Sequence, residues 1–385
     1  MEETTNKLGR GEVDQISINV YVDINGISNI FLVNEIEISI LLKKNKRADI
    51  EKLWLSFFKN KKFDFPLNKA QEIFIKHNKK DINKIFNYIN FRYLFYLCGF
   101  KKIDIGYPPY LLIEAVSSCN LKCPFCFQID KTFTKKPYMG VMNLDFFKKV
   151  VDEADELGIG AITMGSRGEP TMHKNFKDML KYLGTKKNIF EIKLNTNATH
   201  LTEELCHEIF KNNMSQIVIS ADHYEKKTFE ELRKNSNFEK IVSNVDKLYQ
   251  IRKQYKDCIT EIRISGINFY KNLDQNKFYE FWKKRSDHVT VGNAIERWDT
   301  YSNSEHPEIN DPCEFLWDRM YVWFDGKVNP CDSDYKSYLS YGNLKENSIK
   351  EIWHSKIIER SRNNHINNDR KKIDPCNKCG VTFTK

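Results

Sequence analysis

Strand-like and helix-like patterns alternate along the middle of the chain, and this alternation limits the possible folds more than any other feature. Short apolar runs alternate with longer segments that carry apolar residues at i, i+3 and i+4. The predicted strands are 111–117, 160–165, 190–195, 216–220, 260–266 and 288–292, and the predicted helices are 143–158, 174–184, 202–212, 225–255 with a break near Asn235, and 275–284. Six such units predict an α/β fold whose parallel sheet curls into a partial (β/α)6 barrel. Functional residues of such folds gather at the carboxyl ends of the strands.

The segments on either side of this alternation have different patterns, which predicts three domains. Residues 1–106 are expected to form an α+β domain, in which strands at 16–24 and 27–33 meet at a turn at Asn25-Gly26 and precede helices such as ADIEKLWLSFF. The stretch YPPY opens the barrel domain, 107–300. Residues 301–385 are expected to hold a hairpin around Asp325-Gly326, a helix near 347–361 and a cysteine-bearing tail.

Cysteine content and charge narrow the cellular setting. The chain has 10 cysteines, no signal-peptide pattern at its N-terminus and no apolar run of the ~20 residues that a membrane helix needs. We therefore expect a cytoplasmic protein without a membrane partner, whose cysteines serve metal or redox chemistry rather than disulfides. The formal charge of +9 comes from lysines spread along the chain, which indicates a solvated surface and no nucleic-acid partner.

Three cysteines follow the first predicted strand directly, in the stretch CNLKCPFCF. Cys119, Cys123 and Cys126 are spaced C-x3-C-x2-C. Thiolates are the usual ligands of iron–sulfur clusters, and a [4Fe–4S] cluster normally takes four of them. Three ligands would leave one iron open to an exogenous chelating molecule. The alternative is a structural zinc knuckle that takes its fourth ligand from elsewhere in the chain.

This loop resembles the cluster-binding loop of the radical S-adenosylmethionine (SAM) superfamily, in its place after the first strand and in the aromatic Phe125 before its last cysteine. The resemblance implies that the open iron binds the amino and carboxylate groups of SAM, with Phe125 in the cofactor site. One-electron reduction by an external donor such as flavodoxin or ferredoxin would then cleave SAM to methionine and a 5′-deoxyadenosyl radical for hydrogen abstraction. The cofactor carries this chemistry, and the protein orients it.

The end of the second predicted strand carries GSRGEP, which looks like the family's Gly-Gly-Glu element with Arg167 in place of the first glycine of the pair. The resemblance implies that Gly168 and Glu169 offer backbone groups to the methionine ammonium. Glycine permits such a close approach of the backbone. The alternative is an ordinary turn that begins a helix.

Two more strand ends and one loop fit the same family. LNTNAT ends the third predicted strand, where Asn195 and Asn197 would hydrogen-bond the ribose or the carboxylate of SAM. VISADH ends the fourth and is similar to the family's Ser-x-Asp strand end, so Ser220 would contact the methionine carboxylate. Arg233 lies in a region where relatives place a carboxylate-binding arginine, a role that suits its fork of donors.

A second set of cysteines lies near the C-terminal end of the chain. Twelve residues separate Cys313 from Gly326 and four separate Gly326 from Cys331, which resembles the opening of the SPASM domain. Only the pair Cys376 and Cys379 follows, so the set matches the shortened variant called twitch, with one auxiliary [4Fe–4S] cluster bound by all four cysteines. A structural zinc site made from the same four cysteines is the alternative.

The other three cysteines, Cys98, Cys206 and Cys258, are expected to be ordinary buried residues. None is predicted to lie near the strand ends, where a radical epimerase would need a hydrogen-atom donor. A two-electron oxidation, with the auxiliary cluster as the electron acceptor, needs no such donor. We therefore expect an oxidation.

The family resemblance does not fix the substrate. Arg263 is predicted to point into the barrel as a ligand clamp, and the stretch AIERWDTYSN supplies Glu296, Arg297 and Asp299 as acid and base groups suited to a hydroxylated ring. The alternatives are an ion pair that lines the barrel and a salt bridge between domains. We expect a radical SAM oxidoreductase that dehydrogenates a sugar-like or nucleotide-sugar metabolite.

Two other functions stay open. The N-terminal segment loosely resembles the winged-helix peptide-recognition element of some peptide-modifying relatives, which would make the protein a maturation enzyme for ribosomally made peptides. A non-enzymatic iron–sulfur scaffold or sensor would explain the four-cysteine set but not the open three-cysteine set.

Overall fold

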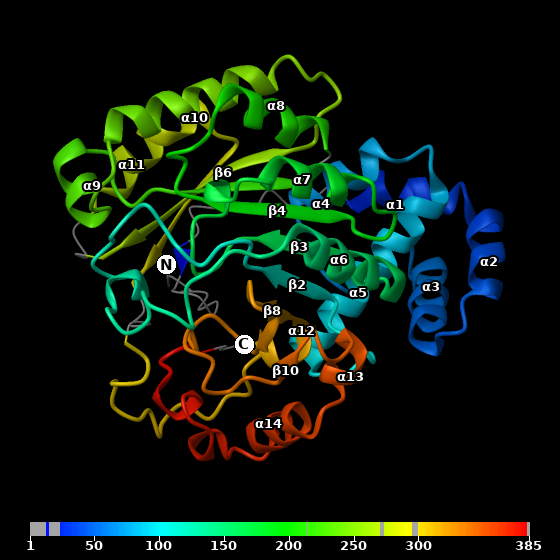
Figure 1. Ribbon diagram of the computed structural model, residues 1–385. Coiled ribbons are helices and arrows are strands. Elements are labelled where there is room, and N and C mark those ends of the chain that lie inside the picture. The colour runs from blue at the N-terminus through cyan, green and yellow to red at the C-terminus, as the bar shows by residue number, and fades with distance from the viewer. Residues whose placement is uncertain (1–12, 15–23, 213, 270–272, 295–298, 383–385) are drawn as a thin grey trace, which may run out of the picture.

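The computed structural model describes residues 13–14, 24–212, 214–269, 273–294 and 299–382, and within them ten strands form one sheet (Figure 1). The sheet order is β1-β7-β6-β5-β4-β3-β2-β8-β9-β10, in which β2 to β7 run parallel to one another and β1 runs antiparallel to β7. The bounds are β1 Val13–Asp14, β2 Tyr110–Ile113, β3 Ala161–Met164, β4 Glu191–Thr196, β5 Gln216–Ser220, β6 Glu261–Asn268, β7 His288–Asn293, β8 Met320–Val322, β9 Lys327–Asn329 and β10 Gly342–Asn343. The predicted six-stranded parallel sheet is therefore confirmed.

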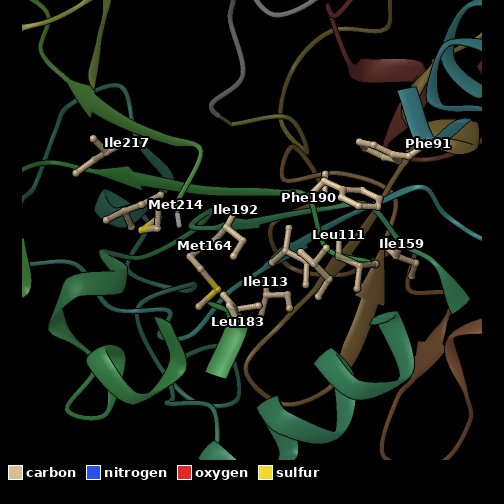
Figure 2. Packing of buried hydrophobic residues seen from close by; sticks show 14 of the residues in the cluster. Phe91, Leu111, Ile113, Ile159, Met164, Leu183, Phe190, Ile192, Met214 and Ile217 are labelled. Atoms are coloured by element: carbon tan, nitrogen blue, oxygen red, sulfur yellow. The ribbon is translucent and has the colours of Figure 1, made fainter. Parts of the chain in front are cut away.

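Helices connect the parallel strands and cover one face of the sheet. They are α6 Leu144–Leu157, α7 Phe176–Gly184, α8 Glu203–Lys211, α9 Lys226–Leu232, α10 Phe238–Arg252 and α11 Gln275–Trp282. The predicted break near Asn235 separates α9 from α10, and Asn235 has a φ of 71°, a region that asparagine tolerates. Ile192 and Ile217 lie in the apolar layer that Figure 2 shows. Burial alternates along β4 and β6, so the opposite side chains line the inner face of the barrel.

The described N-terminal residues beyond β1 are helical, which corrects one prediction. The helices are α1 Ile24–Leu32, α2 Glu35–Lys44, α3 Ala48–Asn60, α4 Lys69–His77 and α5 Ile82–Lys101. The predicted strand 27–33 falls largely within α1, because Ile27 and Phe31, spaced i and i+4, are both buried and Phe31 packs edge-on against Trp54 at 5.3 Å. The predicted strand 16–24 lies almost wholly outside the described residues.

Helix α5 packs at the amino end of the barrel. Tyr88 Oη donates to Glu191 Oε1 at 2.7 Å, and Arg92 forms an ion pair with the same carboxylate at 3.3 Å. Glu191 is the first residue of β4 and belongs to its inward-facing set. These contacts occupy the amino end of the barrel, so any ligand site lies toward the carboxyl ends of the strands.

The C-terminal segment extends the sheet past β2. β8 runs parallel to β2, and β8 and β9 form the predicted hairpin, with Gly326 at a φ of 91° in its turn. Helix α12, Phe315–Asp318, precedes the hairpin, and helices α13, Ile349–Trp353, and α14, Lys356–Ile366, follow it. The single helix predicted near 347–361 is therefore two helices. No helix in the described parts of the chain combines the length and apolar character of a membrane span.

Candidate active site

The first three cysteines lie in the loop that leaves β2. Cys126 N donates to Cys123 O at 3.0 Å, and Leu121 N donates to Cys119 Sγ at 3.4 Å, so backbone bonds shape the loop. Burial raises the pKa of Cys126 to about 12 and that of Cys119 to about 11, and neighbouring thiols of the set add to both rises. Thiols that act on one another in this way lie close together, and bound iron would supply the positive charge that lets them ionise.

The type of ligand bears on which metal group the loop fits. Thiolate is the usual protein ligand of iron–sulfur clusters, in which each thiolate binds an iron of its own. The three thiols of this loop therefore suit the predicted cluster, and a zinc ion held by the same thiols stays the alternative. Among the described residues, no three Cys, His, Asp or Glu side chains are close enough together to hold one metal ion.

A cavity of about 870 Å³ opens beside the three cysteines and is lined by the carboxyl ends of the barrel strands. Three of its lining residues carry polar atoms that, within the described part of the chain, are buried without a hydrogen-bond partner: Ser166 Oγ, Asn195 Oδ1 and Arg233 Nε. Leaving a buried polar group unpaired costs ~1–3 kcal/mol. The cavity therefore fits a polar ligand next to the cysteine loop, and the amino-acid end of SAM is such a ligand.

Arg233 is a buried cation held by one carboxylate. Its Nη2 lies 2.7 Å from Asp222 Oδ2, and Asp222 also accepts a hydrogen bond from Ile267 N at 3.0 Å. Burial opposes the charge on Arg233, but Asp222 and the thiols of Cys123 and Cys119 outweigh it and raise the pKa of the guanidinium. The side chain stays charged next to the cysteine loop, with Nε still available for a carboxylate.

Gly168 and Glu169 have structural roles that the sequence did not reveal. A Cβ on Gly168 would lie 2.1 Å from Val116 O, so glycine lets the loop after β3 pack directly on the backbone of the cysteine loop. Glu169 Oε2 accepts a hydrogen bond from Asn197 N at 2.7 Å and so fixes the end of β4. Both residues line the cavity. Their backbone contact to SAM stays a prediction.

The other predicted SAM residues divide into two groups. Asn195, Ser220 and Phe125 line the cavity, and Phe125 stacks on Phe269 with the ring centroids 3.9 Å apart. Asn197 also lines it, but its side chain is used within the protein, where Nδ2 donates to Cys119 Sγ at 3.7 Å. Asn197 therefore contacts a predicted cluster ligand, and its contact to the ribose or carboxylate of SAM stays a prediction.

The four C-terminal cysteines also lie together, away from this cavity except at Cys331, whose next residue lines it. Burial raises the pKa of Cys313 to about 12, and burial together with the other thiols of the set raises the pKa values of Cys331 and Cys376 well above normal. Arg370 fixes the tail pair, because it donates to the backbone oxygens of Cys376, at 3.0 Å, and Cys379, at 2.7 Å.

The four predicted catalytic residues differ in whether they lie at the cavity. Arg263 lines the cavity, and its Nε and Nη2 donate to Thr290 Oγ1 at 3.2 and 3.0 Å. Asp299 is not among the lining residues, because its carboxylate accepts a hydrogen bond from Tyr335 Oη at 3.0 Å and caps the turn at Tyr301. Glu296 and Arg297 lie outside the described residues.

Sequence reasoning missed several residues of the cavity wall. Lys193, Asp332, Ser333 and Phe269 all line it. Lys193 could have been found, because it lies two residues before Asn195 and therefore on the same inward face of β4. Asp332 and Ser333 carry no local signal beyond their place after Cys331.

Two of the three remaining cysteines are buried as expected, and the third, Cys258, is only partly buried. Cys98 and Cys206 are fully buried, and burial raises the pKa of Cys206 to about 12. Cys258 Sγ lies 3.1 Å from Thr260 Oγ1, next to the start of β6 at the amino end of the barrel. None of the three is among the residues that line the cavity.

Sequence comparison matches two parts of the chain to family models. Residues 113–269 match the Radical SAM superfamily, and residues 313–380 match SPASM, described as an iron-sulfur cluster-binding domain. A GTP 3′,8-cyclase of Desulforamulus reducens is 26% identical over 165 residues, 43% of this chain and 50% of that protein. The chain thus spans about half the length of this curated relative.

Two solved structures share the fold. BtrN in complex with AdoMet and 2-DOIA has a TM-score of 0.50 at 17% identity, covering 73% of this chain and 97% of that one. SuiB of Streptococcus suis, bound to the precursor peptide SuiA, has a TM-score of 0.55 at 16% identity, covering 83% of this chain and 88% of that one. At these identities the likeness establishes the fold alone.

Proposed function

Because the chain belongs to the radical SAM superfamily and carries a C-terminal SPASM domain, we propose that it oxidises a small sugar-like metabolite with a hydroxyl or anionic group next to the carbon that loses hydrogen. Iron–sulfur-dependent catalysis follows from the family, and the substrate class and the oxidation are the proposal. The observation that carries it is the cationic, polar floor of the cavity at Arg263.

The two cysteine sets have separate duties in this proposal. Cys119, Cys123 and Cys126 would hold the SAM-binding cluster, and the four C-terminal cysteines would hold one auxiliary cluster, as in twitch proteins. When bound, SAM and its cluster supply the hydrogen-abstracting radical, and the auxiliary cluster supplies an acceptor for one substrate electron. Arg233 and Asn195 would orient the amino-acid end of SAM, and a flavodoxin or ferredoxin would supply the external electron.

Arg263 lies one layer deeper in the barrel than Ser220, toward the amino ends of the strands. It precedes Ser265 by two residues on β6 and pairs in register with Val218, as Ser265 pairs with Ser220. Arg263 Nε and Nη2 both donate hydrogen bonds to the hydroxyl of Thr290. Among the described residues, no carboxylate forms an ion pair with Arg263. A partly buried guanidinium without an ion-pair partner favours a ligand that brings an anionic or hydroxyl group.

The size of the cavity favours a small ligand. Pockets for small molecules commonly measure ~300–1,000 Å³, and the 870 Å³ here must hold part of SAM as well as the substrate. The space left fits a metabolite or a single peptide side chain. Asp332 and Ser333 form the wall on the auxiliary side, so the substrate would lie between the two cysteine sets.

A substrate screen tests the proposal. Reconstituted protein with dithionite and SAM is offered aminocyclitols, sugar phosphates and nucleotide sugars, and 5′-deoxyadenosine is measured together with loss of two hydrogens from the substrate. A true substrate should raise 5′-deoxyadenosine roughly tenfold above the substrate-free rate. Arg263→Met should remove this stimulation and keep the background, whereas Arg285→Met, which breaks an outer ion pair to Asp246, should keep both. Stimulation by peptides alone would overturn the proposal.

Peptide modification is the second candidate, and one surface favours it. Val33 and Ile36 are each 81% exposed, and Ile40, four residues further along α2, is 50% exposed, so an apolar stripe faces outward along α2 and the turn before it. The match to SuiB covers a share of this chain that residues 107–385 alone could not fill, so part of the N-terminal segment takes part in it. Such a stripe could receive the apolar face of a peptide.

A binding measurement tests this second candidate. A labelled peptide encoded next to the gene should bind the wild-type protein and lose roughly tenfold in affinity with Val33→Asp/Ile36→Asp. Leu55→Asp, at an apolar residue 62% exposed on α3, is the matched control and should leave the affinity unchanged. Equal losses in both variants would mean that the stripe does not select the peptide.

A further inference from the structure

Arg167 is a buried residue whose three guanidinium nitrogens all donate hydrogen bonds within the protein. The residue is 3% exposed and lies in the loop after β3, directly before Gly168. Nε and Nη2 donate to the two carboxylate oxygens of Glu114 at 2.5 and 2.6 Å, and Nη1 donates to Tyr335 O at 2.7 Å. The guanidinium also lies over the Trp323 ring, 4.0 Å from its centroid. These contacts fix the side chain in one position.

The partners of Arg167 belong to both parts of the molecule. Glu114 follows β2, and its backbone N donates to Val322 O at 2.9 Å, at the end of β8. Tyr335 lies four residues after Cys331. Arg167 therefore joins the loop predicted to bind SAM to the segment that follows a cysteine of the auxiliary set.

The cysteine loop joins the same network. Gln128 Nε2 donates to Arg167 O at 2.6 Å, and Phe127, next to Cys126, stacks on Tyr335 with centroids 5.0 Å apart. Lys336 forms an ion pair with Asp130 at 2.7 Å. Three loops, 126–130, 165–170 and 331–336, thus meet in one buried cluster with Arg167 at its centre.

We propose that Arg167 is a positioning residue that fixes the SAM-binding loop to the auxiliary-cluster loop, so that order at the auxiliary site sets the affinity for SAM. A glycine at this position, as in the Gly-Gly-Glu element, would leave Glu114 buried without a cation and Tyr335 O without its donor. Energetic coupling between sites travels through such packed, hydrogen-bonded contacts. The inference requires SAM binding and is independent of which substrate the enzyme oxidises.

Charge compensation alone is the competing explanation, and lysine distinguishes the two. A lysine at this position could neutralise Glu114, but it cannot form two parallel bonds to that carboxylate, a third to Tyr335 O and a stack on Trp323. Arg167→Lys should therefore weaken SAM binding if Arg167 positions the loops, and should restore it if only charge matters. Arg319→Lys is the matched control, because Arg319 also holds a carboxylate with two bonds, to Asp318 at 2.6 and 2.7 Å, outside the cavity.

The decisive experiment is a double-mutant cycle on the dissociation constant of SAM, measured by equilibrium dialysis on reconstituted protein. One arm is Cys376→Ala/Cys379→Ala, which disrupts the auxiliary site without touching the three loops. The other is Glu114→Gln/Arg167→Met, which removes both buried charges together. Iron content and melting temperature confirm that each protein is folded and holds its SAM cluster.

We expect each arm to raise the dissociation constant roughly tenfold and the combination to raise it no further. Arg167→Lys should behave like Glu114→Gln/Arg167→Met, and Arg319→Lys like the wild type. Multiplicative effects in the combined protein, an unchanged constant in the cysteine arm, or wild-type binding by Arg167→Lys would each overturn the proposal. If Glu114→Gln/Arg167→Met does not fold, the same cycle with Arg167→Lys decides.

Discussion

The first three cysteines come from one loop, whereas the four C-terminal cysteines are brought together from three separate segments of the chain. The cavity lies beside the first set, and its wall carries the polar atoms Ser166 Oγ, Asn195 Oδ1 and Arg233 Nε, which have no partner among the described residues. Such atoms also occur beside the second set, at His365 Nε2 and Asn377 Oδ1, so the cavity and the charged neighbours distinguish the two sets. Beside the second set, Arg370 donates hydrogen bonds from Nε, Nη1 and Nη2 to backbone oxygens of the C-terminal tail.

The difference shows how one type of ligand can serve two purposes. A local loop with three thiols leaves a coordination position and nearby polar groups for a small molecule. A site assembled from distant segments, with its charged neighbour fully hydrogen-bonded, holds the surrounding chain in place. We therefore expect the first set to control SAM chemistry directly and the second to act through structure and electron transfer.

The largest expected effect comes from removing the first set. Cys119→Ala/Cys123→Ala/Cys126→Ala should abolish formation of 5′-deoxyadenosine, because the cluster that binds SAM loses all its protein ligands. The measurement is 5′-deoxyadenosine after addition of dithionite and SAM under anaerobic conditions. Cys258→Ala is the control and should keep wild-type amounts, since this thiol does not line the cavity. Product above background in the triple variant would contradict the role of this loop.

The next effect is on affinity for SAM. Arg233→Lys keeps a positive charge beside Asp222 but loses the fork of donors, so the dissociation constant of SAM should rise roughly tenfold to a hundredfold. Equilibrium dialysis on reconstituted protein measures it. Arg252→Lys changes an arginine that pairs with Asp287 near the amino end of the barrel, and it should bind SAM normally. Normal binding by both variants would remove Arg233 from the SAM site.

Removing the tail pair should change radical formation much less. Cys376→Ala/Cys379→Ala should lower the iron content by about half, because one of two clusters is lost, yet keep 5′-deoxyadenosine formation at saturating SAM. Iron analysis and product detection on the same sample check both parts. Loss of all 5′-deoxyadenosine would show that the tail site is required to build the first site, and the contrast between the two sets would fail.

The sequence was sufficient to predict the parts of the fold that depend on residues close together in the chain. The six parallel strands and the loops at their ends were predicted from alternation and motif spacing, because each strand end lies directly beside its own motif. The prediction of a strand at 27–33 was wrong, because the burial of Ile27 and Phe31 against α3 depends on tertiary packing. Short apolar runs do not distinguish a buried helix from a strand.

The residues missed at the site depend on contacts between distant segments. Arg167 stood out as a departure from the family motif, but its partners Glu114 and Tyr335 lie 53 and 168 residues away in the sequence. Asp332 lines the cavity only because the C-terminal segment folds against the barrel. For the same reason, Asp299 accepts a hydrogen bond from Tyr335 Oη. No single-sequence pattern encodes such pairings.

Two carboxylates near the two cysteine sets differ in the direction of their pKa shifts. Burial alone would raise the pKa of Asp130, but hydrogen bonds from Lys336, Thr132 and Tyr335 outweigh it and hold that pKa well below its usual range. Burial raises the pKa of Asp334 to about 6. Asp130 therefore adds stability above pH ~4, the value in the unfolded chain, whereas Asp334 costs stability as the pH rises from ~4 through 6.

This contrast gives the smallest expected effect, on stability rather than chemistry. In urea unfolding between pH 4.5 and 7.5, the free energy of unfolding of Asp334→Asn relative to wild type should shift in favour of the variant by about 2 kcal/mol as the pH rises. Loss of the hydrogen bonds that Asp334 accepts adds a constant offset and leaves this slope unchanged. Asp130→Asn should instead stay less stable than wild type by a constant amount, because Asp130 is ionised in both states over most of this range. A flat difference for Asp334→Asn would mean that its carboxylate is already compensated, and the two loops would then be electrostatically alike.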